Sequence, residues 1–138
     1  MNIKNAIIAC FYKYFEFNGR SSRKECWWFI LFTYLVSWSL ELMAWILMGA
    51  DSYWNSGYMK EEYPLGLDII IFLWAFIILI PTLAVTSRRM HDISKSGWNQ
   101  LWILTIVGII WVIFYLMIKN SDPNPNKYGN IPHDKISF

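Results

Sequence analysis

Three apolar runs, each long enough to cross a lipid bilayer, constrain the fold of this chain more than any other feature. They cover about residues 23–48, 67–87 and 97–118. A helix needs about 20 apolar residues to cross the roughly 30 Å hydrocarbon core of a bilayer. Inside lipid each backbone polar group must be satisfied internally, and a helix achieves this within one segment. The sequence therefore predicts an all-α integral membrane protein with three transmembrane helices.

Composition supports this class and excludes others. The 138 residues are 56% hydrophobic, 19% aromatic and 16% charged, whereas about a quarter of the residues of a soluble domain are charged. The formal net charge of +2 offers no broad basic surface, so nucleic acid is not an expected partner. The length predicts one membrane domain over 1–138. Cys10 and Cys26 lack metal-ligand spacing, so we expect no metal site, cofactor or disulfide framework.

The segment before the first run is predicted to form a separate helix. Within residues 2–17, apolar side chains recur at i, i+3, i+4 and i+7, which predicts an amphipathic helix lying in the headgroup layer. Asn18-Gly19 ends this helix. Ser22, followed three residues later by Glu25, forms a capping box that starts the first transmembrane helix.

The distribution of basic residues predicts the orientation in the membrane. The polar loop 49–66 holds one lysine, and the irregular polar tail 120–138, together with the preceding Lys119, holds three. The N-terminal segment holds five basic residues and the bend before the third run holds three: Lys4, Lys13, Arg20, Arg23, Lys24, Arg88, Arg89 and Lys95. Cytosolic segments carry the excess of basic residues, so the N-terminus and the bend are expected in the cytosol. Three crossings would place the tail on the opposite, periplasmic side.

The bend has the sequence RRMHDISKSGW (residues 88–98), and its polar residues allow three interpretations. The first is an internal polar clamp, in which Asp92 neutralises nearby arginines and Gly97 permits the turn. The second is an anion site for a phospholipid headgroup or a phosphorylated ligand, because free N–H groups at helix N-termini favour anions. The third is simple anchoring by basic residues. The candidate residues for the clamp or the anion site are Arg20, Arg23, Arg88, Arg89, His91, Asp92, Lys95, Ser96 and Gly97.

Three sequence blocks resemble a known family. FNGRSSRKECWW (residues 17–28) is similar to F-x-G-R-x-x-R-x-E-Y-W, with Cys26 in place of an aromatic residue. PTLAVTSRRMHDISKSGW (81–98) is similar to P-x-x-A-V-x-x-R-R-L-H-D-x-x-x-S-G-W. NPNKYG (124–129) is similar to G-x-N-x-Y-G, with asparagine in place of the first glycine. The chain thus resembles the domain of unknown function 805 family, the small YhaH-like bacterial inner-membrane proteins. This resemblance implies a polytopic inner-membrane protein and no particular activity.

A polar stripe lies inside the first predicted transmembrane helix. Thr33, Ser37 and Glu41 recur at i, i+4 and i+8 and share one helix face. A carboxylate within a transmembrane helix costs a few kcal/mol unless it is paired, protonated or able to reach the interface. Glu41 is therefore interpreted either as a snorkelling or interhelical hydrogen-bonding residue, or as a proton or substrate contact.

These observations favour a non-enzymatic function. His91 and Asp92 beside arginines are compatible with phosphoryl chemistry, but the second histidine, His133, is expected on the opposite side of the membrane. The sequence also lacks a nucleophile elbow or an acidic metal-binding pair near the bend. We expect a structural, regulatory or interaction subunit, which contacts the lipid bilayer and forms a homo-oligomer or binds another membrane protein. The alternative is binding or transport of an anionic phospholipid or small ligand, again as an oligomer.

Overall fold

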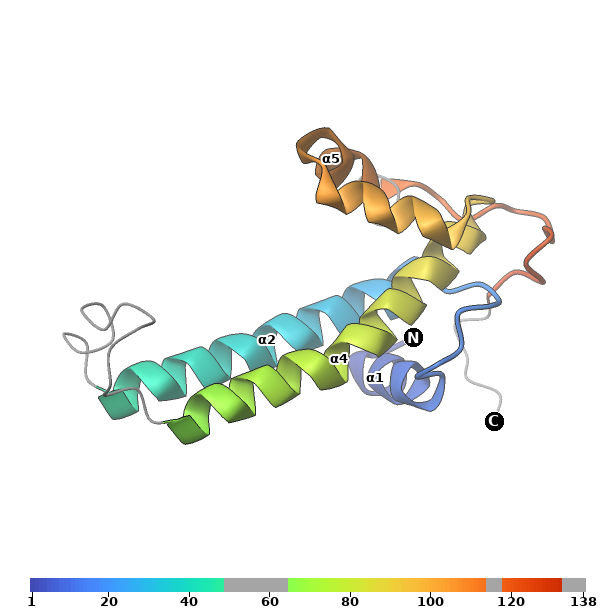
Figure 1. Ribbon diagram of the computed structural model, residues 1–138. Helices are drawn as coiled ribbons and strands as arrows, with labels where there is room; N and C mark the ends of the chain where they lie inside the picture. The colour runs from blue at the N-terminus through green and yellow to red at the C-terminus, as the bar shows by residue number, and fades with distance from the viewer. Residues whose placement is uncertain (49–64, 114–117, 133–138) are drawn as a thin grey trace. The chain divides into compact units, whose positions relative to one another are not determined.

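The computed structural model describes residues 1–48, 65–113 and 118–132 and is helical (Figure 1). Within these ranges there are no strands, and a single isolated bridge joins Asn126 and Gly129. The five helices of the described ranges are α1 (Ile3–Tyr12), α2 (Arg23–Met48), α4 (Leu65–Asp92), the 3₁₀ helix η1 (Gly97–Leu104) and α5 (Ile106–Ile113).

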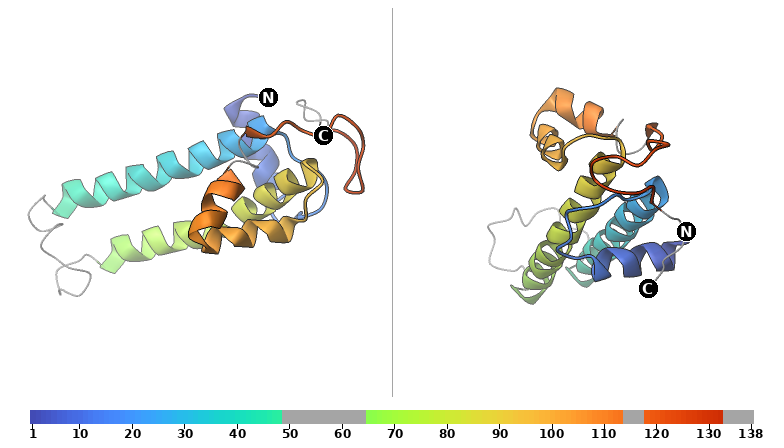
Figure 2. Two further views of the ribbon diagram at one scale, coloured as in Figure 1. Left: turned by 90° about the horizontal axis from the view of Figure 1, so that it is seen from above. Right: turned by 90° about the vertical axis from the view of Figure 1, so that its right-hand side faces the viewer.

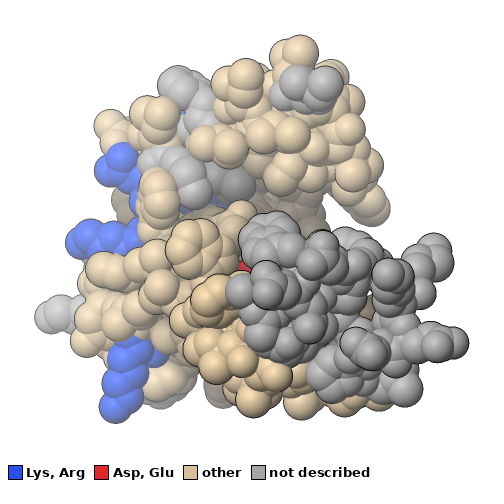
Figure 3. Space-filling model, turned by 90° about the vertical axis from the view of Figure 1, so that its left-hand side faces the viewer, with Lys and Arg blue, Asp and Glu red and all other residues tan. Residues whose placement is uncertain are grey.

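Two of these helices are long and apolar enough to cross a membrane. α2 has 26 residues and α4 has 28, which gives lengths of about 39 and 42 Å at 1.5 Å per residue. Within the most apolar stretch of each, only 11% and 17% of the residues are buried inside the protein. The core helix of a soluble protein would be mostly buried, so this exposure favours helices that face lipid. In the face that Figure 3 shows, Lys and Arg side chains gather along the left edge, and most other described residues in view are neither basic nor acidic.

The observed bounds agree with the prediction for the first transmembrane helix and extend the second. α2 begins directly after Ser22, whose hydroxyl accepts a hydrogen bond from the Glu25 amide at 3.2 Å, as the capping box predicted. α4 continues through Pro81 and ends at Asp92, five residues beyond the predicted end at residue 87. The first part of the polar bend is therefore the last turn of α4.

The chain divides into two compact units. The two-helix unit comprises Thr33–Leu79, and in it the α2 and α4 segments lie side by side (Figures 1 and 2). The indole Nε1 of Trp74 on α4 donates to the Ser37 hydroxyl on α2 at 3.0 Å. The helix-end unit comprises Met1–Phe32 and Ile80–Phe138, and it contains the bend, η1, α5 and the tail.

In the helix-end unit, α1 packs against the first turns of α2. Cys10 on α1 and Cys26 and Phe29 on α2 belong to one buried apolar cluster. The Phe11 and Phe29 rings meet edge to face, with centroids 5.8 Å apart. α1 ends at Tyr12 and is therefore five residues shorter at its C-terminal end than the predicted 2–17 helix. The apolar face of α1, which the sequence assigned to the headgroup layer, therefore packs in part against the protein core.

The predicted third transmembrane helix, 97–118, is wrong as one continuous helix. η1 ends at Leu104, Thr105 is extended with ψ 146°, and α5 begins at Ile106 and packs against η1. The Thr105 hydroxyl accepts from the Gly108 amide at 3.0 Å and so caps the second helix. A Cβ on Gly108 would lie 1.8 Å from the Trp102 carbonyl oxygen, so glycine permits this close approach. At eight residues η1 extends about 16 Å, which is about half of the hydrocarbon core.

Candidate functional site

The candidate site is built on the C-terminal end of α4, where the backbone turns sharply. Ser94 has φ 59°, in the left-handed region. The Ser94 amide donates to the His91 carbonyl at 3.0 Å, and the Lys95 amide donates to the Met90 carbonyl at 2.9 Å. These two bonds form the Schellman arrangement that ends many helices. The helix therefore stops before Lys95, and Lys95 does not extend the helical face of Arg88, His91 and Asp92.

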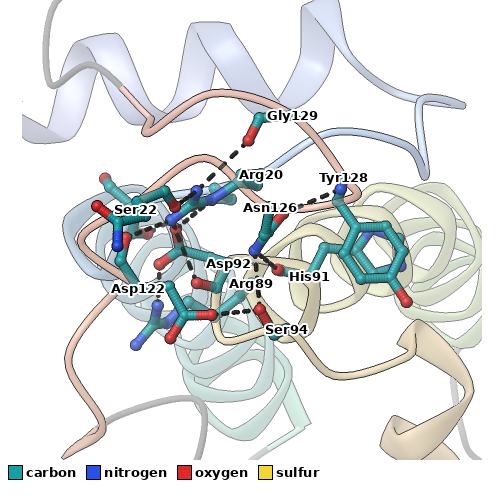
Figure 4. A network of polar contacts seen from close by, with 12 residues as sticks. Arg20, Ser22, Arg89, His91, Asp92, Ser94, Asp122, Asn126, Tyr128 and Gly129 are labelled. Carbon is teal, nitrogen blue, oxygen red and sulfur yellow. Dashed lines mark hydrogen bonds and ion pairs between the residues drawn. The ribbon is translucent and has the colours of Figure 1, made fainter.

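The carboxylate of Asp92 binds two buried arginines from different parts of the chain (Figure 4). Its Oδ1 accepts from Arg20 Nε at 2.9 Å and lies 2.9 Å from Arg20 Nη2. Its Oδ2 accepts from Nη1 of Arg89, three residues earlier on α4. The three side chains are almost completely buried, at 0–1% exposure. We call Arg20, Arg89 and Asp92 the polar clamp.

The polar clamp also holds the C-terminal tail through backbone carbonyl groups. Arg89 Nη2 donates to the Lys119 carbonyl. The Arg20 guanidinium donates to four further carbonyls, at 3.3, 2.8, 2.9 and 3.4 Å, which belong to Asp92, Asp122, Asn124 and Gly129. Arg20 thereby joins the segment before α2, the end of α4 and the tail. All three of its guanidinium nitrogens donate to protein oxygen atoms.

Arg88 forms a separate ion pair with a partner that the sequence did not indicate. Its Nη2 donates to Oε1 of Glu25 at 3.1 Å, and its Nη1 donates to the carbonyls of Lys13 and Glu16 at 3.2 and 3.0 Å. The Cys10 thiol lies 3.9 Å from the same Glu25 oxygen. Burial raises the pKa of Cys10 well above its ordinary value, and the charge of Glu25 acts in the same direction. The thiol therefore stays protonated and donates to the carboxylate.

His91 belongs to a different part of the site from the arginines. Its Nδ1 lies 3.2 Å from the Gly19 carbonyl oxygen, to which it donates. The imidazole stacks on the Tyr128 ring, with centroids 3.8 Å apart and an interplanar angle of 5° (Figure 4). Its backbone carbonyl accepts from the Asn126 side chain at 2.9 Å. His91 thus fixes the linker after α1 and the tail against α4.

The other predicted site residues lie around these contacts without sharing one function. Arg23 is exposed and donates to the Ile118 carbonyl at 3.3 Å, so it is not the partner of Asp92. Lys95 is half-buried just after α4. The Ser96 hydroxyl accepts weakly from the Trp98 amide at 3.4 Å and caps η1. Gly97 is buried, and a Cβ there would lie 2.0 Å from the Ser87 hydroxyl oxygen.

The predicted polar stripe on α2 is only partly engaged with protein. Thr33 is buried, Ser37 is half-buried and accepts from Trp74 at 3.0 Å, and Glu41 is exposed. Ser37 therefore acts as an interhelical hydrogen-bonding residue within the two-helix unit.

The predicted separation of the tail from the bend by the membrane is wrong. The Asp122 amide donates to the Asp92 carbonyl at 3.1 Å, and the Ser94 hydroxyl donates to the Asp122 carboxylate. Groups joined by direct hydrogen bonds lie on one side of a bilayer. The physical reason is the break at Thr105, because α5 folds back on η1 instead of continuing η1 for the length of a transmembrane helix. His133 lies outside the described residues.

The geometry leaves the two clamp arginines and Arg88 little capacity to bind an added anion. Arg20 and Arg89 share the charge of Asp92, and Arg88 is paired with Glu25. Each of the three arginines also donates to backbone carbonyls. In the described part of the chain, no three His, Cys, Asp or Glu side chains are grouped so that they could hold a metal ion. This cluster is therefore a buried contact between chain segments, in which the two carboxylates offset two of the three arginine charges and backbone carbonyls accept from all three arginines.

Comparison with known proteins identifies the family. Residues 14–130 match the family described as "Protein of unknown function (DUF805)". The chain belongs to the DUF805 family. Two similar relatives are proteins of Escherichia coli strain K12: inner membrane protein YhaI, 28% identical over 120 residues, and inner membrane protein YhaH, 26% identical over 125 residues. The matches cover 86% of this chain and 87% and 88% of the respective relatives. No solved structure matches the chain.

The DUF805 match includes every residue of the polar clamp and the tail carbonyls that Arg20 contacts. It begins at residue 14, after the end of α1. Two relatives that are named inner membrane proteins, together with two exposed apolar helices of spanning length, support a helical membrane protein. Sequence reasoning found Arg20, Arg89 and Asp92. It missed Glu25 as an ion-pair partner, although the capping box had already marked Glu25 as a residue near the start of α2.

Proposed function

We propose that this DUF805 protein is a non-enzymatic, multi-pass inner-membrane protein that acts as a structural or interaction subunit. Its polar clamp fixes the cytosolic ends of α2 and α4 to the C-terminal tail. The observation that carries the proposal is the Asp92 carboxylate, which is 0% exposed and ion-paired with Arg20 and Arg89 at once. A buried charge retained inside a protein needs such partners, and they fix the relative positions of the segments that carry them.

The proposed topology has two crossings, by α2 and α4, in place of three. η1 is too short to cross and is separated from α5 by the break at Thr105, and in this topology both lie at the cytosolic boundary with their exposed apolar side chains toward lipid. The tail then returns to the side of the N-terminus, which agrees with the hydrogen bonds that join it to α4. Lys119 and Lys127 of the tail join the basic residues of the N-terminal segment and the bend on one face. The positive-inside rule assigns that face to the cytosol more strongly than it did for three crossings.

The internal use of charge supports a structural role over an anion site. An anion site needs donors that face a ligand, whereas the buried arginines here donate to Asp92, Glu25 and backbone carbonyls. These internal hydrogen bonds also argue against catalysis at this cluster, because a general acid or base must reach a substrate. The clamp therefore explains why polar residues gather in one short bend between apolar segments.

Labelling with a membrane-impermeant maleimide tests the topology. Single cysteines replace Ser56, Ser94 or Asn130 in a background in which Cys10 and Cys26, both buried, are alanine. In spheroplasts, the cysteine at position 56 should react, and those at 94 and 130 should react only after the membrane is opened. Labelling of position 130 without 94 would indicate three crossings and overturn the proposed topology.

The mass of the purified protein tests the subunit role. Light scattering in a mild detergent, after correction for bound detergent, should give a complex heavier than one 16.4 kDa chain. Asp92→Asn should reduce the complex, because it removes the charge that holds the cytosolic segments together. Asp122→Ala is the matched control, since it removes a carboxylate from the tail but keeps the carbonyl that Arg20 contacts. A parent protein that is a lone monomer in membranes and in detergent would refute a subunit role.

A further inference from the structure

A cavity of about 470 Å³ lies beside the last turns of α4, within the helix-end unit. Its walls come from the linker after α1, from α4, from the beginning of η1 and from the tail. This volume falls in the range of small-molecule sites. The clamp residues Arg20, Arg89 and Asp92 do not line it. The cavity is thus a second site, distinct from the contacts that join the tail to α4.

Polar side chains that line this cavity include Ser87, His91 and Gln100, and each of these three has hydrogen-bonding capacity left. Ser87 is 5% exposed, and its hydroxyl has no hydrogen-bond partner among the described residues. His91 donates from Nδ1 to the Gly19 carbonyl, so in the neutral ring Nε2 is an acceptor. Gln100 accepts from the Thr86 hydroxyl through Oε1 at 2.6 Å, which leaves its amide hydrogens as donors.

Two of these polar side chains, His91 and Gln100, are held in place by contacts with other protein groups. His91 is fixed by Gly19 and by stacking on Tyr128, and Gln100 is fixed by Thr86. A ligand would therefore meet a hydroxyl, an imidazole acceptor and an amide donor that need little reordering, which favours binding. Such convergent polar groups are what fix the orientation of a ligand in a mainly apolar site.

The rest of the wall is uncharged and mostly apolar, with Asn18 and Ser96 as further polar side chains. No Lys, Arg, Asp or Glu is among the described residues that line the cavity. The apolar and aromatic wall residues are Phe17, Leu83, Trp98, Leu101 and Tyr128. An ionised ligand would find no ion-pair partner among these lining residues to offset its partial desolvation, so a neutral ligand is favoured. Trp98 and Leu101 are also exposed on the outside of η1, which would extend an apolar path from the cavity to the surface.

We propose that this cavity binds an uncharged amphiphile whose polar end carries a hydroxyl or carbonyl oxygen. The Ser87 hydroxyl and the Gln100 amide donate to the ligand oxygen, and His91 Nε2 accepts from a ligand hydroxyl. The apolar body of the ligand lies against Trp98 and Leu101. Two membrane components share this chemistry, a diacylglycerol and an isoprenoid quinone or quinol. The inference goes beyond the proposed subunit role and does not rest on it.

The test uses the full chain in detergent micelles and three short-chain probes. Dioctanoylglycerol and decylubiquinone are the uncharged probes for the two sources. Dioctanoyl phosphatidic acid has the same chains as the first probe, with a phosphate in place of its hydroxyl. Saturable binding, measured with radiolabelled lipid for the glycerol probes and by tryptophan quenching for the quinone, should occur with at least one uncharged probe. Phosphatidic acid should bind at least tenfold more weakly than dioctanoylglycerol if the latter is the ligand, and more weakly than decylubiquinone otherwise.

The Ser87→Ala variant tests whether the uncharged probe binds in this cavity. It should weaken binding of the uncharged probe about two- to tenfold, the range of one neutral hydrogen bond, and it should leave the melting temperature near the parent value because the hydroxyl has no described partner. Ser39→Ala is the matched control, since Ser39 is a helix serine that does not line the cavity. Gln100→Leu should also weaken binding. No saturable binding of either uncharged probe, tighter binding of phosphatidic acid, or equal binding by the Ser87 and Ser39 variants would each overturn the inference. None of these results bears on the subunit role, which is measured by mass and topology.

Discussion

Removal of the Asp92 carboxylate should be among the most destabilising single changes in this chain. Asp92→Ala removes the carboxylate that Arg20 and Arg89, at 1% and 0% side-chain exposure, share. Loss of one partner of a buried ion pair typically costs about 3–5 kcal/mol. The expected loss in the free energy of unfolding is therefore about 3–5 kcal/mol. It should not fall below about 3 kcal/mol, because one carboxylate here pairs with two cations. This corresponds to a fall in melting temperature of roughly 10–20 °C for a chain of this size.

Melting in a mild detergent, followed by tryptophan fluorescence, measures this loss. Asp122→Ala is the control, because its carboxylate accepts only an exposed contact from Ser94, and it should cost about 1 kcal/mol or less. Arg20→Ala combined with Asp92→Ala should be less destabilising than the sum of the two single variants, by about 0.5–3 kcal/mol, because the two residues share one interaction. An Asp92→Ala protein that melts like the Asp122→Ala protein, with additive double variants, would refute the buried clamp.

Three further changes test other parts of the structure in the same melting assay. Gly97→Ala should cost about 1–3 kcal/mol because its Cβ would lie 2.0 Å from the Ser87 hydroxyl oxygen, and Ser87→Ala should restore part of that loss; an unaffected single variant would contradict the close approach. Glu25→Ala should cost about 3 kcal/mol or more by leaving Arg88 buried without its carboxylate, and Glu25→Gln should cost less since it keeps a hydrogen-bond acceptor; equal losses would count against the hydrogen bond. Ser37→Ala should cost only about 1 kcal/mol, one interhelical hydrogen bond, and a loss above 3 kcal/mol would indicate a larger role for the α2 stripe.

The parts of the fold that depend on local sequence could be predicted. The apolar length of α2 and α4 and the Ser22 cap are properties of short stretches, and the structure confirms them. The end of α1 could not be predicted, because it depends on a distant residue. Arg88 on α4 donates to the carbonyls of Lys13 and Glu16. In a helix that continued to residue 17, the Lys13 carbonyl would instead accept from the amide of residue 17.

The error over the third apolar run has a similar cause. Apolar composition and length over 97–118 satisfy the requirements for a transmembrane helix, and composition does not register one side-chain cap. Thr105 ends η1 and caps α5, while Gly108 lets the second helix approach the Trp102 carbonyl. A threonine three residues before a glycine is a weak signal within an apolar stretch. The predicted third crossing also separated the tail from the bend, and so the contacts of the tail with Arg20 were not foreseen.

The candidate site was predictable in its charges and not in its carbonyl contacts. Opposite charges on neighbouring segments indicated that Asp92 would bind arginines, and Arg20 and Arg89 are those partners. The Arg88–Glu25 pair was missed because each residue already had a local explanation, as a basic anchor and as a capping residue. Backbone carbonyls are present at every residue, so no sequence pattern distinguishes the four that Arg20 binds.

The contacts of Arg20 with the tail have a consequence for the order in which the protein is made. Arg20 leaves the ribosome about 100 residues before Asp122, Asn124 and Gly129, whose carbonyls complete its set of acceptors. Both α2 and α4 are synthesised, and available to the insertion machinery, before those carbonyls exist. Domains form in the order of synthesis, so we expect the tail to dock after α2 and α4 have been inserted. A nascent chain therefore carries a cation with incomplete partners until Gly129 has been synthesised, and closure of the tail over Arg20 is a late step of assembly.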